Sequence, residues 1–273
     1  MYKLIEQSII GKQFQANCED GLFISEKIIA VVDGGSPKGK IKWEKNKTSG
    51  WFAKELILKA LKKIDPSWTN KKILEYINSY LRKEYRKNET FFYKNPEEQL
   101  QAGIVFYNDT RKEIVSYGDC PILINNELYD HSKFIDIIST GLRSFYLHLD
   151  DLGVLNKDLK NREEYSKNII LDFLTKQSFF SNLNQPFGFP VINGLKLNHK
   201  LTVTHKVKSK DMIVLASDGY IKLMPSLKES EKILKKYLSK DPECYKTFFS
   251  TKGVKKGNKS FDDRTYIRFQ IIN

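Results

Sequence analysis

The sequence has few cysteines, no long apolar run and no nucleotide-binding glycine motif. Its three cysteines, Cys18, Cys120 and Cys244, are widely spaced, so they support neither a disulfide framework nor a zinc knuckle. No apolar run approaches the ~18 residues of a membrane-spanning helix, and the N-terminus lacks the features of a secretory signal. Neither GxGxxG nor GxxxxGK[ST] follows a predicted strand, which argues against dinucleotide and P-loop sites. These absences predict a cytoplasmic protein in a reducing compartment, without membrane contact.

Arginine is also scarce, although the chain is strongly basic. Lys and Arg together number 46 against 33 acidic residues, which gives a net charge of +13, but only seven of the 46 are arginines. A basic excess is compatible with nucleic-acid binding or with a solvated surface that steers acidic ligands. Recognition of bases and phosphates favours the guanidinium group, so we prefer the solvated surface and expect no nucleic-acid partner.

The 273 residues suffice for one large domain with a sizeable core, and their apolar pattern mixes strands with helices. Helical spacing occurs in residues 52–61 and 73–81 and around residues 233–237. Short apolar runs between turn signals predict strands at residues 22–24, 28–32, 102–107, 113–117, 122–124, 201–207, 212–216 and 265–272. This order favours an α+β fold with mainly antiparallel sheet over a βαβ fold, and we expect residues 1–273 to form a single domain.

One segment of the chain is less regular than the rest. Residues 133–180 are mostly helical in pattern and charged, and residues 184–194 are rich in Asn, Gly and Pro. We interpret part of residues 130–200 as a helical insertion or a lid. The aromatic residues around 184–194 are compatible with core packing or with a loop that borders an active site, and the sequence leaves both open.

Acidic residues stand next to the ends of four predicted strands. Two acidic clusters follow a strand and two precede one; in chain order they are Glu19-Asp20, Asp33-Gly34, Asp218-Gly219 and Asp262-Asp263. In an antiparallel sheet the end of one strand lies beside the start of its neighbour, so all four clusters can meet at one edge. Gathered carboxylates repel one another unless a cation lies among them, and an all-oxygen set suits Mg²⁺ or Mn²⁺. Two such ions can activate a shared water and clamp a phosphoryl group.

Each of these clusters also has a simpler interpretation. Asp-Gly is a common hairpin turn, and a single pair is more often a turn than a metal ligand. The joint placement of four clusters at compatible strand ends is what favours a metal site.

Five short motifs follow one another along the chain: Asn17-Cys18-Glu19-Asp20-Gly21, Val32-Asp33-Gly34-Gly35, Gly118-Asp119-Cys120, Ala216-Ser217-Asp218-Gly219 and Asp262-Asp263-Arg264-Thr265. In order and approximate spacing they resemble the motifs of the metal-dependent type 2C (PPM) protein phosphatases, over nearly the whole chain. The resemblance implies an αββα sandwich. In such a sandwich two antiparallel sheets carry a dinuclear Mn/Mg centre at one end, and helices cover both outer faces.

The resemblance further implies the inner ligands of that centre. Asp33 corresponds to the residue that bridges the two metals, with the carbonyl of Gly34 as a further ligand. Asp218 and Asp262 correspond to residues that bind one metal directly.

Outer positions follow from the same resemblance. Glu19 and Asp20 correspond to acids that act mostly through metal-bound waters, so Asp20 joins Asp33 as a candidate catalytic carboxylate. Asp119 resembles the acid that helps to hold a third, weaker metal. Lys222 stands where that third site has its second acid, which argues for two ions.

The chain departs from the family pattern at the phosphate and at the proton donor. Where many members have a phosphate-binding Arg this chain has Gln15, and Lys12 is the candidate substitute. Residues 35–38 contain no His where eukaryotic members have the residue thought to protonate the leaving group. A metal-bound water, Lys38 or a His from the insertion are the remaining donors. The four histidines lie far from the motifs and are interpreted as surface or structural residues: His131, His148, His199 and His205.

These patterns predict a metal-dependent phosphoric monoester hydrolase. We expect a water between two Mn²⁺ or Mg²⁺ ions to attack phosphoserine or phosphothreonine in a phosphorylated protein partner. The alternative is a catalytically weak module of the same fold that binds a phosphorylated partner without hydrolysing it.

Overall fold

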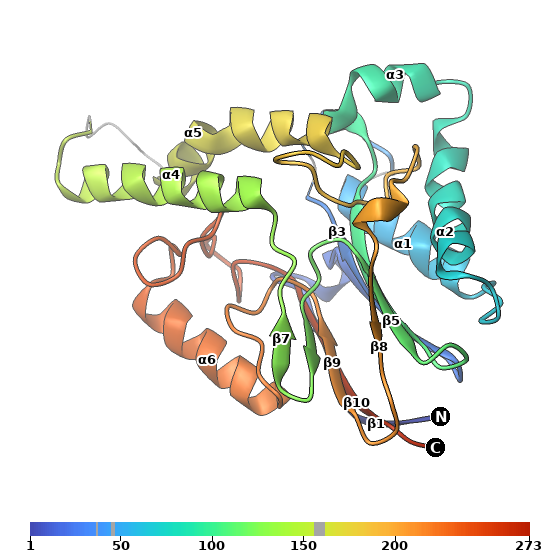
Figure 1. The fold of residues 1–273 in the computed structure, drawn as a ribbon. Coiled ribbons are helices and arrows are strands. Elements are labelled where there is room, and N and C mark those ends of the chain that lie inside the picture. The colour runs from blue at the N-terminus through green and yellow to red at the C-terminus, as the bar shows by residue number, and fades with distance from the viewer. Residues whose placement is uncertain (37, 45–46, 156–161) are drawn as a thin grey trace.

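The computed structural model describes residues 1–36, 38–44, 47–155 and 162–273, and its strands form two five-stranded sheets (Figure 1). The first sheet contains, in spatial order, β1 (Tyr2–Ile10), β10 (Arg264–Ile271), β9 (Met212–Ala216), β6 (Ile122–Ile124) and β7 (Glu127–Tyr129). The second contains β2 (Asp20–Ile24), β3 (Ile28–Gly34), β4 (Ala102–Asn108), β5 (Glu113–Tyr117) and β8 (Val203–Lys206). All neighbouring strands run antiparallel. The predicted α+β class with antiparallel sheets is therefore confirmed.

Helices lie on the outer sides of both sheets (Figure 1). The longer helices are α1 (Ser49–Leu61), α2 (Asn70–Tyr85), α4 (Phe134–Asp151), α5 (Arg162–Lys176) and α6 (Leu227–Lys240), and α3 (Glu89–Lys94) is short. Short 3₁₀ helices span Gln15–Asn17, Pro96–Glu98, Gln177–Phe180 and His199–Leu201. Helices α1 and α2 cover the second sheet, and α6 lies along the first, as the αββα arrangement requires. In the described residues no helix is both long and apolar enough to cross a bilayer.

Hydroxyl side chains determine where three of these helices begin. Thr48, Thr69 and Ser226 precede α1, α2 and α6, and each side-chain oxygen accepts a backbone N–H from the first turn, at 3.1, 3.2 and 3.3 Å. Such a cap satisfies an amide that has no partner inside the helix. The caps explain why helical periodicity starts where it does in the sequence.

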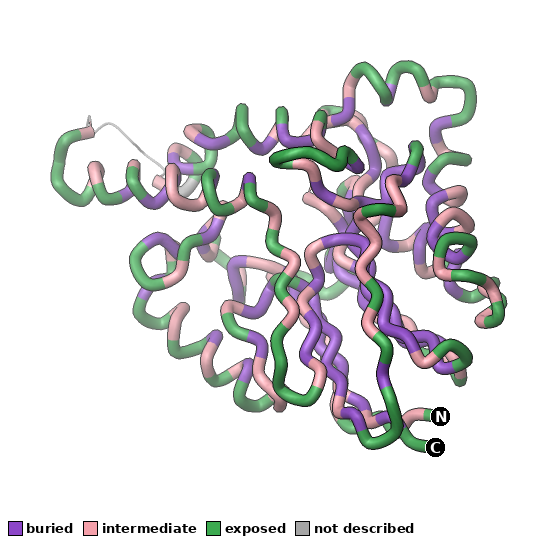
Figure 2. Tube along the Cα trace, in the orientation of Figure 1, coloured by how far each residue is buried: buried purple, intermediate pink, exposed green. Residues whose placement is uncertain are grey.

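Strand β3 is buried on both faces, which explains its uninterrupted apolar sequence. Ile28, Ala30 and Val32 pack with α1 and α2, whereas Ile29 and Val31 pack between the two sheets. Successive side chains of a strand point to opposite faces, so both faces of this central strand need apolar residues. Figure 2 shows the same pattern as buried chain concentrated along the central strands.

Two strands and one helix, β1, β7 and α3, were not predicted from the sequence. Strand β1 lies at the edge of its sheet and pairs with β10, with Tyr2 opposite Ile271, and several of its residues are exposed. Its sequence lacks strong apolar alternation because none of its residues is fully buried. β7 and α3 are too short, at three and six residues, to show a period.

Helices α4 and α5 pack against each other and stand away from the two sheets (Figure 1). They confirm the predicted helical character of residues 133–180, except that residues 156–161 lie outside the described residues. Within α5, Ile170 and Leu174 are buried, whereas Phe173 is 42% exposed. The helical insertion expected within residues 130–200 corresponds in position to this pair.

Candidate functional site

Five aspartates lie where strands end, on one side of the sandwich. Asp20 and Asp33 are cross-strand partners in the β2–β3 ladder. Asp119 and Asp218 come two residues after β5 and β9, and Asp262 comes two residues before β10. Antiparallel pairing thus brings residues almost 250 positions apart to the same end of the two sheets.

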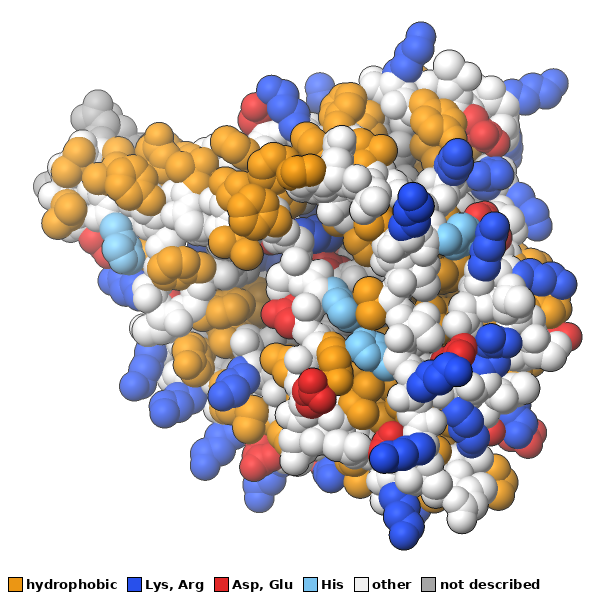
Figure 3. Space-filling model, viewed as in Figure 1, with side chains coloured by type: hydrophobic (Ala, Val, Ile, Leu, Met, Phe, Trp, Pro, Cys, Tyr) orange, Lys and Arg blue, Asp and Glu red, His pale blue; other side chains and the backbone are white. Residues whose placement is uncertain are grey.

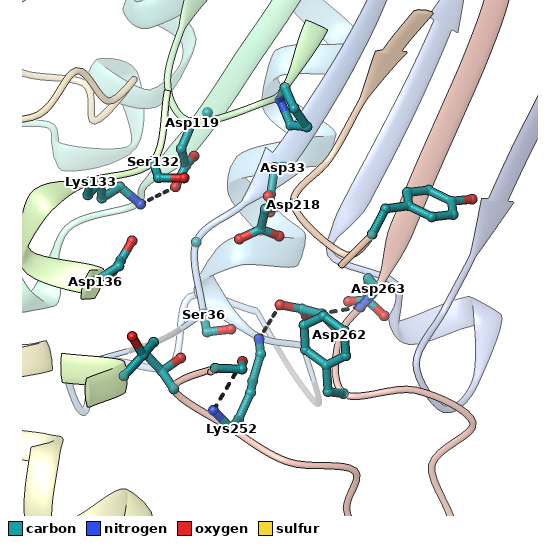
Figure 4. Close-up of a pocket in the computed structure, with 18 of the residues that line it drawn as sticks. Asp33, Ser36, Asp119, Ser132, Lys133, Asp136, Asp218, Lys252, Asp262 and Asp263 are labelled. Atoms are coloured by element: carbon teal, nitrogen blue, oxygen red, sulfur yellow. Dashed lines mark hydrogen bonds and ion pairs between the residues drawn. The ribbon is translucent and has the colours of Figure 1, made fainter. Parts of the chain in front are cut away.

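These ends surround one cavity of about 420 Å³ (Figure 4). Every metal ligand implied by the family resemblance lines it: Glu19, Asp20, Asp33, Gly34, Asp119, Asp218 and Asp262. Lys12, the remaining candidate, is not among the lining residues.

Asp33 and Asp218 are acids without a protein partner at the centre of this cavity. No hydrogen bond or ion pair joins either carboxylate to another described residue. Burial raises the pKa of Asp33, and the charges of Asp218 and Asp20 raise it further. Burial, followed by the charges of Asp262 and Asp119, raises the pKa of Asp218 to about 7. The ionised forms of these two acids are therefore disfavoured unless a cation lies among them.

Asp20 differs from these two because hydroxyl groups hold it. Its side chain is 3% exposed and accepts hydrogen bonds from Ser217 Oγ at 2.6 Å and Thr265 Oγ1 at 2.9 Å. Burial raises the pKa of Asp20, and the hydrogen bond from Ser217 opposes that increase. Ser217 and Thr265 were not predicted as site residues, although each belongs to one of the five motifs.

Glu19 is connected to the start of α1. It accepts hydrogen bonds from Thr48 Oγ1 at 2.6 Å, Lys12 Nζ at 3.0 Å and Ser36 Oγ at 3.3 Å. Thr48 is also the N-cap of α1. The sequence does not reveal this role of Thr48, because the pairing with Glu19 depends on how α1 packs against the end of β3.

Lys12 lies behind the acidic cluster. Its ammonium lies 3.0 Å from Glu19, 3.2 Å from Asp262 and 3.3 Å from Asp263. Burial lowers the pKa of Lys12, but these three acids outweigh burial and raise it overall. In this structure Lys12 is a half-buried counter-ion of the cluster, and its predicted contact with the substrate phosphate stays a prediction.

Two other lysines line the cavity and pair with its outer acids (Figure 4). Lys252 Nζ contacts Asp262, and Lys133 Nζ contacts Asp119. Burial raises the pKa of both aspartates, but the lysine charges outweigh it, so both values fall below the usual range. These acids are neutralised by the protein, unlike Asp33 and Asp218.

The residues at which the sequence departs from the PPM motifs are Gln15, Lys222 and the loop after Gly34, and they lie in different parts of the site. Gln15 is exposed, and its side-chain oxygen accepts a hydrogen bond from the backbone N–H of Gly11 at 2.9 Å. Gln15 thus stabilises the turn between residues 11 and 15. Lys222 lines the cavity with an exposed side chain. In the loop after Gly34, Pro37 lies outside the described residues, whereas Ser36 and Lys38 line the cavity.

No arginine or histidine is among the described residues that line the cavity. His199 contacts Glu75 at 2.7 Å on the surface of α2, and His148 packs edge-on against Tyr245. His131 and His205 lie near each other beside β7 and β8, with ring centroids 6.3 Å apart.

The donor set fits a hard cation by its chemistry. All its side-chain donors are carboxylates, and two of them have no other partner, which is the situation that a divalent ion resolves. No three His, Cys, Asp or Glu side chains of the described chain are grouped as a bound ion requires. Two of the acids, Asp119 and Asp262, instead contact lysines.

Apolar side chains from α4 and α5 form one wall of the cavity. Ile137 and Thr140 of α4 and Leu174 of α5 line it, as do Phe189 and Val191 of the loop 184–194. This loop therefore borders the cavity, and its Phe189, Val191 and Ile192 are also buried in the core, so both interpretations hold for part of it. Figure 3 shows hydrophobic side chains gathered along the α4 and α5 region, while Lys and Arg are spread over the rest of this face.

No protein-family model matches the chain, and no curated protein matches it. Among solved structures it is similar to the catalytic domain of the serine/threonine protein phosphatase PstP with two manganese ions, at 13% identity and a TM-score of 0.49, with 100% of each chain covered. It is also similar to RsbX with magnesium, at 15% identity and a TM-score of 0.44, with 99% of each chain covered. A third is the PPM Ser-Thr phosphatase MsPP from Mycobacterium smegmatis in complex with cacodylate, at 12% identity and a TM-score of 0.45, with 98% of this chain and 99% of that chain covered. At these values the likeness does not assign an activity to this chain, so the functional conclusion depends on the site.

Proposed function

We propose that this protein is a metal-dependent phosphatase that hydrolyses phosphate monoesters, with phosphoserine and phosphothreonine in proteins as its substrates. The main support is the pair of carboxylates without partners, Asp33 and Asp218, in a cavity that lysines border. Uncompensated carboxylates favour divalent cations, and a cationic border favours a dianionic phosphate.

Asp33, the Gly34 carbonyl, Asp218 and Asp262 would hold two Mn²⁺ or Mg²⁺ ions. When bound, such ions lower the pKa of a water molecule and neutralise charge on the phosphoryl oxygens. Asp20 lies opposite Asp33 and is fixed by its two hydroxyl partners, so it can orient a water by accepting its hydrogen bond. The ion pair between Lys133 and Asp119 favours a two-ion site over a three-ion site.

Apolar side chains line the same cavity as the acids. Ile137, Leu174, Phe189 and Val191 form one apolar part of its wall. A wall of low polarity strengthens the electrostatic interactions inside the cavity. Only a phosphorylated side chain that reaches past this wall would meet Asp33 and Asp218.

The test is turnover of p-nitrophenyl phosphate and of a phosphothreonine peptide with Mn²⁺, with Mg²⁺ and with EDTA. We expect metal-dependent release of phosphate from both substrates. Asp33→Asn should abolish activity and weaken Mn²⁺ binding measured by calorimetry, because it removes an uncompensated charge from the centre of the cluster. His131→Ala should leave both nearly unchanged. Activity that resists EDTA, or an active Asp33→Asn variant, would contradict the proposal.

A catalytically weak module that binds a phosphorylated partner is the second candidate. The observation that favours it is the absence of arginine and histidine from the described lining, together with the lysine pairs on Asp119 and Asp262. It predicts binding of Mn²⁺ and of the phosphothreonine peptide by calorimetry, with no phosphate released at any metal concentration.

A further inference from the structure

Lys38 is a cavity lysine without a counter-ion. It lies in the loop between β3 and α1 and lines the same cavity as the acids. No hydrogen bond or ion pair joins its ammonium to another described residue. Lys133 and Lys252, by contrast, each contact an aspartate.

The surroundings of Lys38 disfavour its positive charge. Burial lowers the pKa of Lys38 to about 8, and the charges of Lys252 and Lys133 contribute to this. Lys167 acts in the same direction, and the carboxylate of Asp136 opposes them. A cation removed from water needs an anionic partner to recover the lost solvation.

The backbone on both sides of Lys38 is held by fixed partners. Before it, the N–H of Gly35 donates to the carbonyl of Gln101 at 2.8 Å. After it, the N–H groups of Lys40 and Ile41 donate to the carboxylate of Glu98, each at 2.8 Å. Both anchors belong to the segment that leads into β4, so the loop positions Lys38 at the cavity.

We propose that Lys38 binds a non-bridging oxygen of the phosphoryl group in the substrate, an inference that rests on the proposed phosphatase function and assigns its missing phosphate-binding residue. The dianionic phosphoryl group is the partner that the lysine lacks. Lys133 and Lys252 keep their aspartates, and Lys12 does not line the cavity. Lys222 lines it but is exposed to solvent, so Lys38 is the half-buried cavity lysine that is available for this contact. The loop that carries Lys38 follows Asp33 and Gly34 directly. Lys38 can therefore contact the phosphoryl group while Asp33 and Gly34 bind the metal ions.

The first experiment compares kinetic constants on the phosphothreonine peptide. Lys38→Met should raise KM about tenfold or more, because it removes a charge-assisted hydrogen bond. Lys38→Arg should keep most of the affinity, since it retains the charge. Lys40→Met is the matched control from the same loop, because its side chain is exposed, and its KM should stay at the wild-type value. An unchanged KM in Lys38→Met, with wild-type protein active, would overturn the inference.

The second experiment does not depend on turnover. Trace labelling with an amine-reactive reagent at pH 8, read by mass spectrometry, should modify Lys38 faster than the exposed Lys40, because more of its amine is unprotonated. Inorganic phosphate added to the Mg²⁺-loaded protein should protect Lys38 but not Lys40, relative to chloride at equal ionic strength. Equal labelling of Lys38 with and without phosphate would overturn the inference.

The two experiments separate failure of this inference from failure of the proposed function. Protection of Lys38 by phosphate in a protein that releases no phosphate would support the phosphate site and contradict the phosphatase activity. An active enzyme in which phosphate does not protect Lys38 and Lys38→Met does not change KM would support the phosphatase activity and contradict the phosphate site at Lys38.

Discussion

Aspartates of the same cavity differ in charge state because of what faces each of them. Asp33 and Asp218 face other acids, which raises their pKa values beyond the effect of burial. Asp119 and Asp262 face lysines, which outweigh burial and lower theirs. The position of the lysines therefore decides which carboxylates attract a cation most strongly.

The Lys252–Asp262 pair leads to a prediction at the scale of one residue. Lys252→Met should increase the affinity for Mn²⁺ about tenfold, because it frees Asp262 Oδ2 while Lys12 stays on Oδ1, and a hydrogen bond between charged groups contributes roughly 1.5–3 kcal/mol. Titration calorimetry of the metal-depleted variant and wild type measures the change.

Lys255→Met is the control for that experiment, since it removes the same charge from the same loop at an exposed position. Its affinity for Mn²⁺ should stay close to wild type. If Lys252→Met binds Mn²⁺ no better than Lys255→Met, Lys252 does not compete with the metal for Asp262.

The start of α1 supports the end of β3, which carries Asp33 and Gly34. Gly34 and Gly50 lie so close that a Cβ on Gly50 would stand 2.7 Å from the oxygen of Gly34 and 2.6 Å from that of Gly35. Real Cβ atoms do not approach backbone oxygens that closely, so only glycine fits at position 50 without movement of the turn. The helix thereby contributes to the position of two expected metal ligands.

At the scale of elements, Gly50→Ala should move the start of α1 away from the turn that carries Gly34 and Gly35. We expect weaker Mn²⁺ binding by calorimetry and a lower melting temperature, with a loss of stability of about 1–3 kcal/mol from overpacking. Gly141→Ala in α4 is the matched control, because a Cβ there meets no atom within 4 Å. Alanine is a better helix former than glycine, so this control should equal or exceed wild-type stability. Normal metal affinity in Gly50→Ala would show that the turn does not depend on this contact.

Element prediction from sequence succeeded where burial leaves a periodic or continuous apolar pattern. Strand β3 has such a run because both its faces are buried, and α1 and α2 bury one face each. Strand β1 has no such pattern, because it is an edge strand without a buried face, and its pairing with β10 at the other end of the chain leaves no local signal. The missed elements are therefore those that pairing or neighbouring structure stabilises.

Charge is distributed unevenly over the whole molecule. Among the described residues, four lysines line the cavity, Lys38, Lys133, Lys222 and Lys252, while Figure 3 shows other basic side chains dispersed over the visible face. The net charge of +13 is thus mostly a solvated surface, with a cluster of acids enclosed at one end of the sheets. Such a cluster destabilises the folded protein until a cation neutralises it.

For the whole molecule we expect Mn²⁺ to raise the melting temperature and EDTA to reverse the rise. A ligand at about a hundred times its dissociation constant adds about 2.7 kcal/mol to the free energy of unfolding. Thermal unfolding with increasing Mn²⁺ measures the shift, and Asp33→Asn should show a smaller one. If Mn²⁺ does not change the melting temperature of the wild type, that result would argue against a metal site.

By itself, the sequence determined the α+β class, the buried strands and the identity of the acids at the strand ends, because these depend on local periodicity and on short motifs. The tertiary structure decided which lysine faces which acid. Lys252 contacts Asp262, Lys133 contacts Asp119, Lys12 contacts Asp262 from outside the cavity lining, and Lys38 has no counter-ion among the described residues. These pairings depend on contacts between distant segments, and a charge acts on its neighbours in space whatever their separation along the chain.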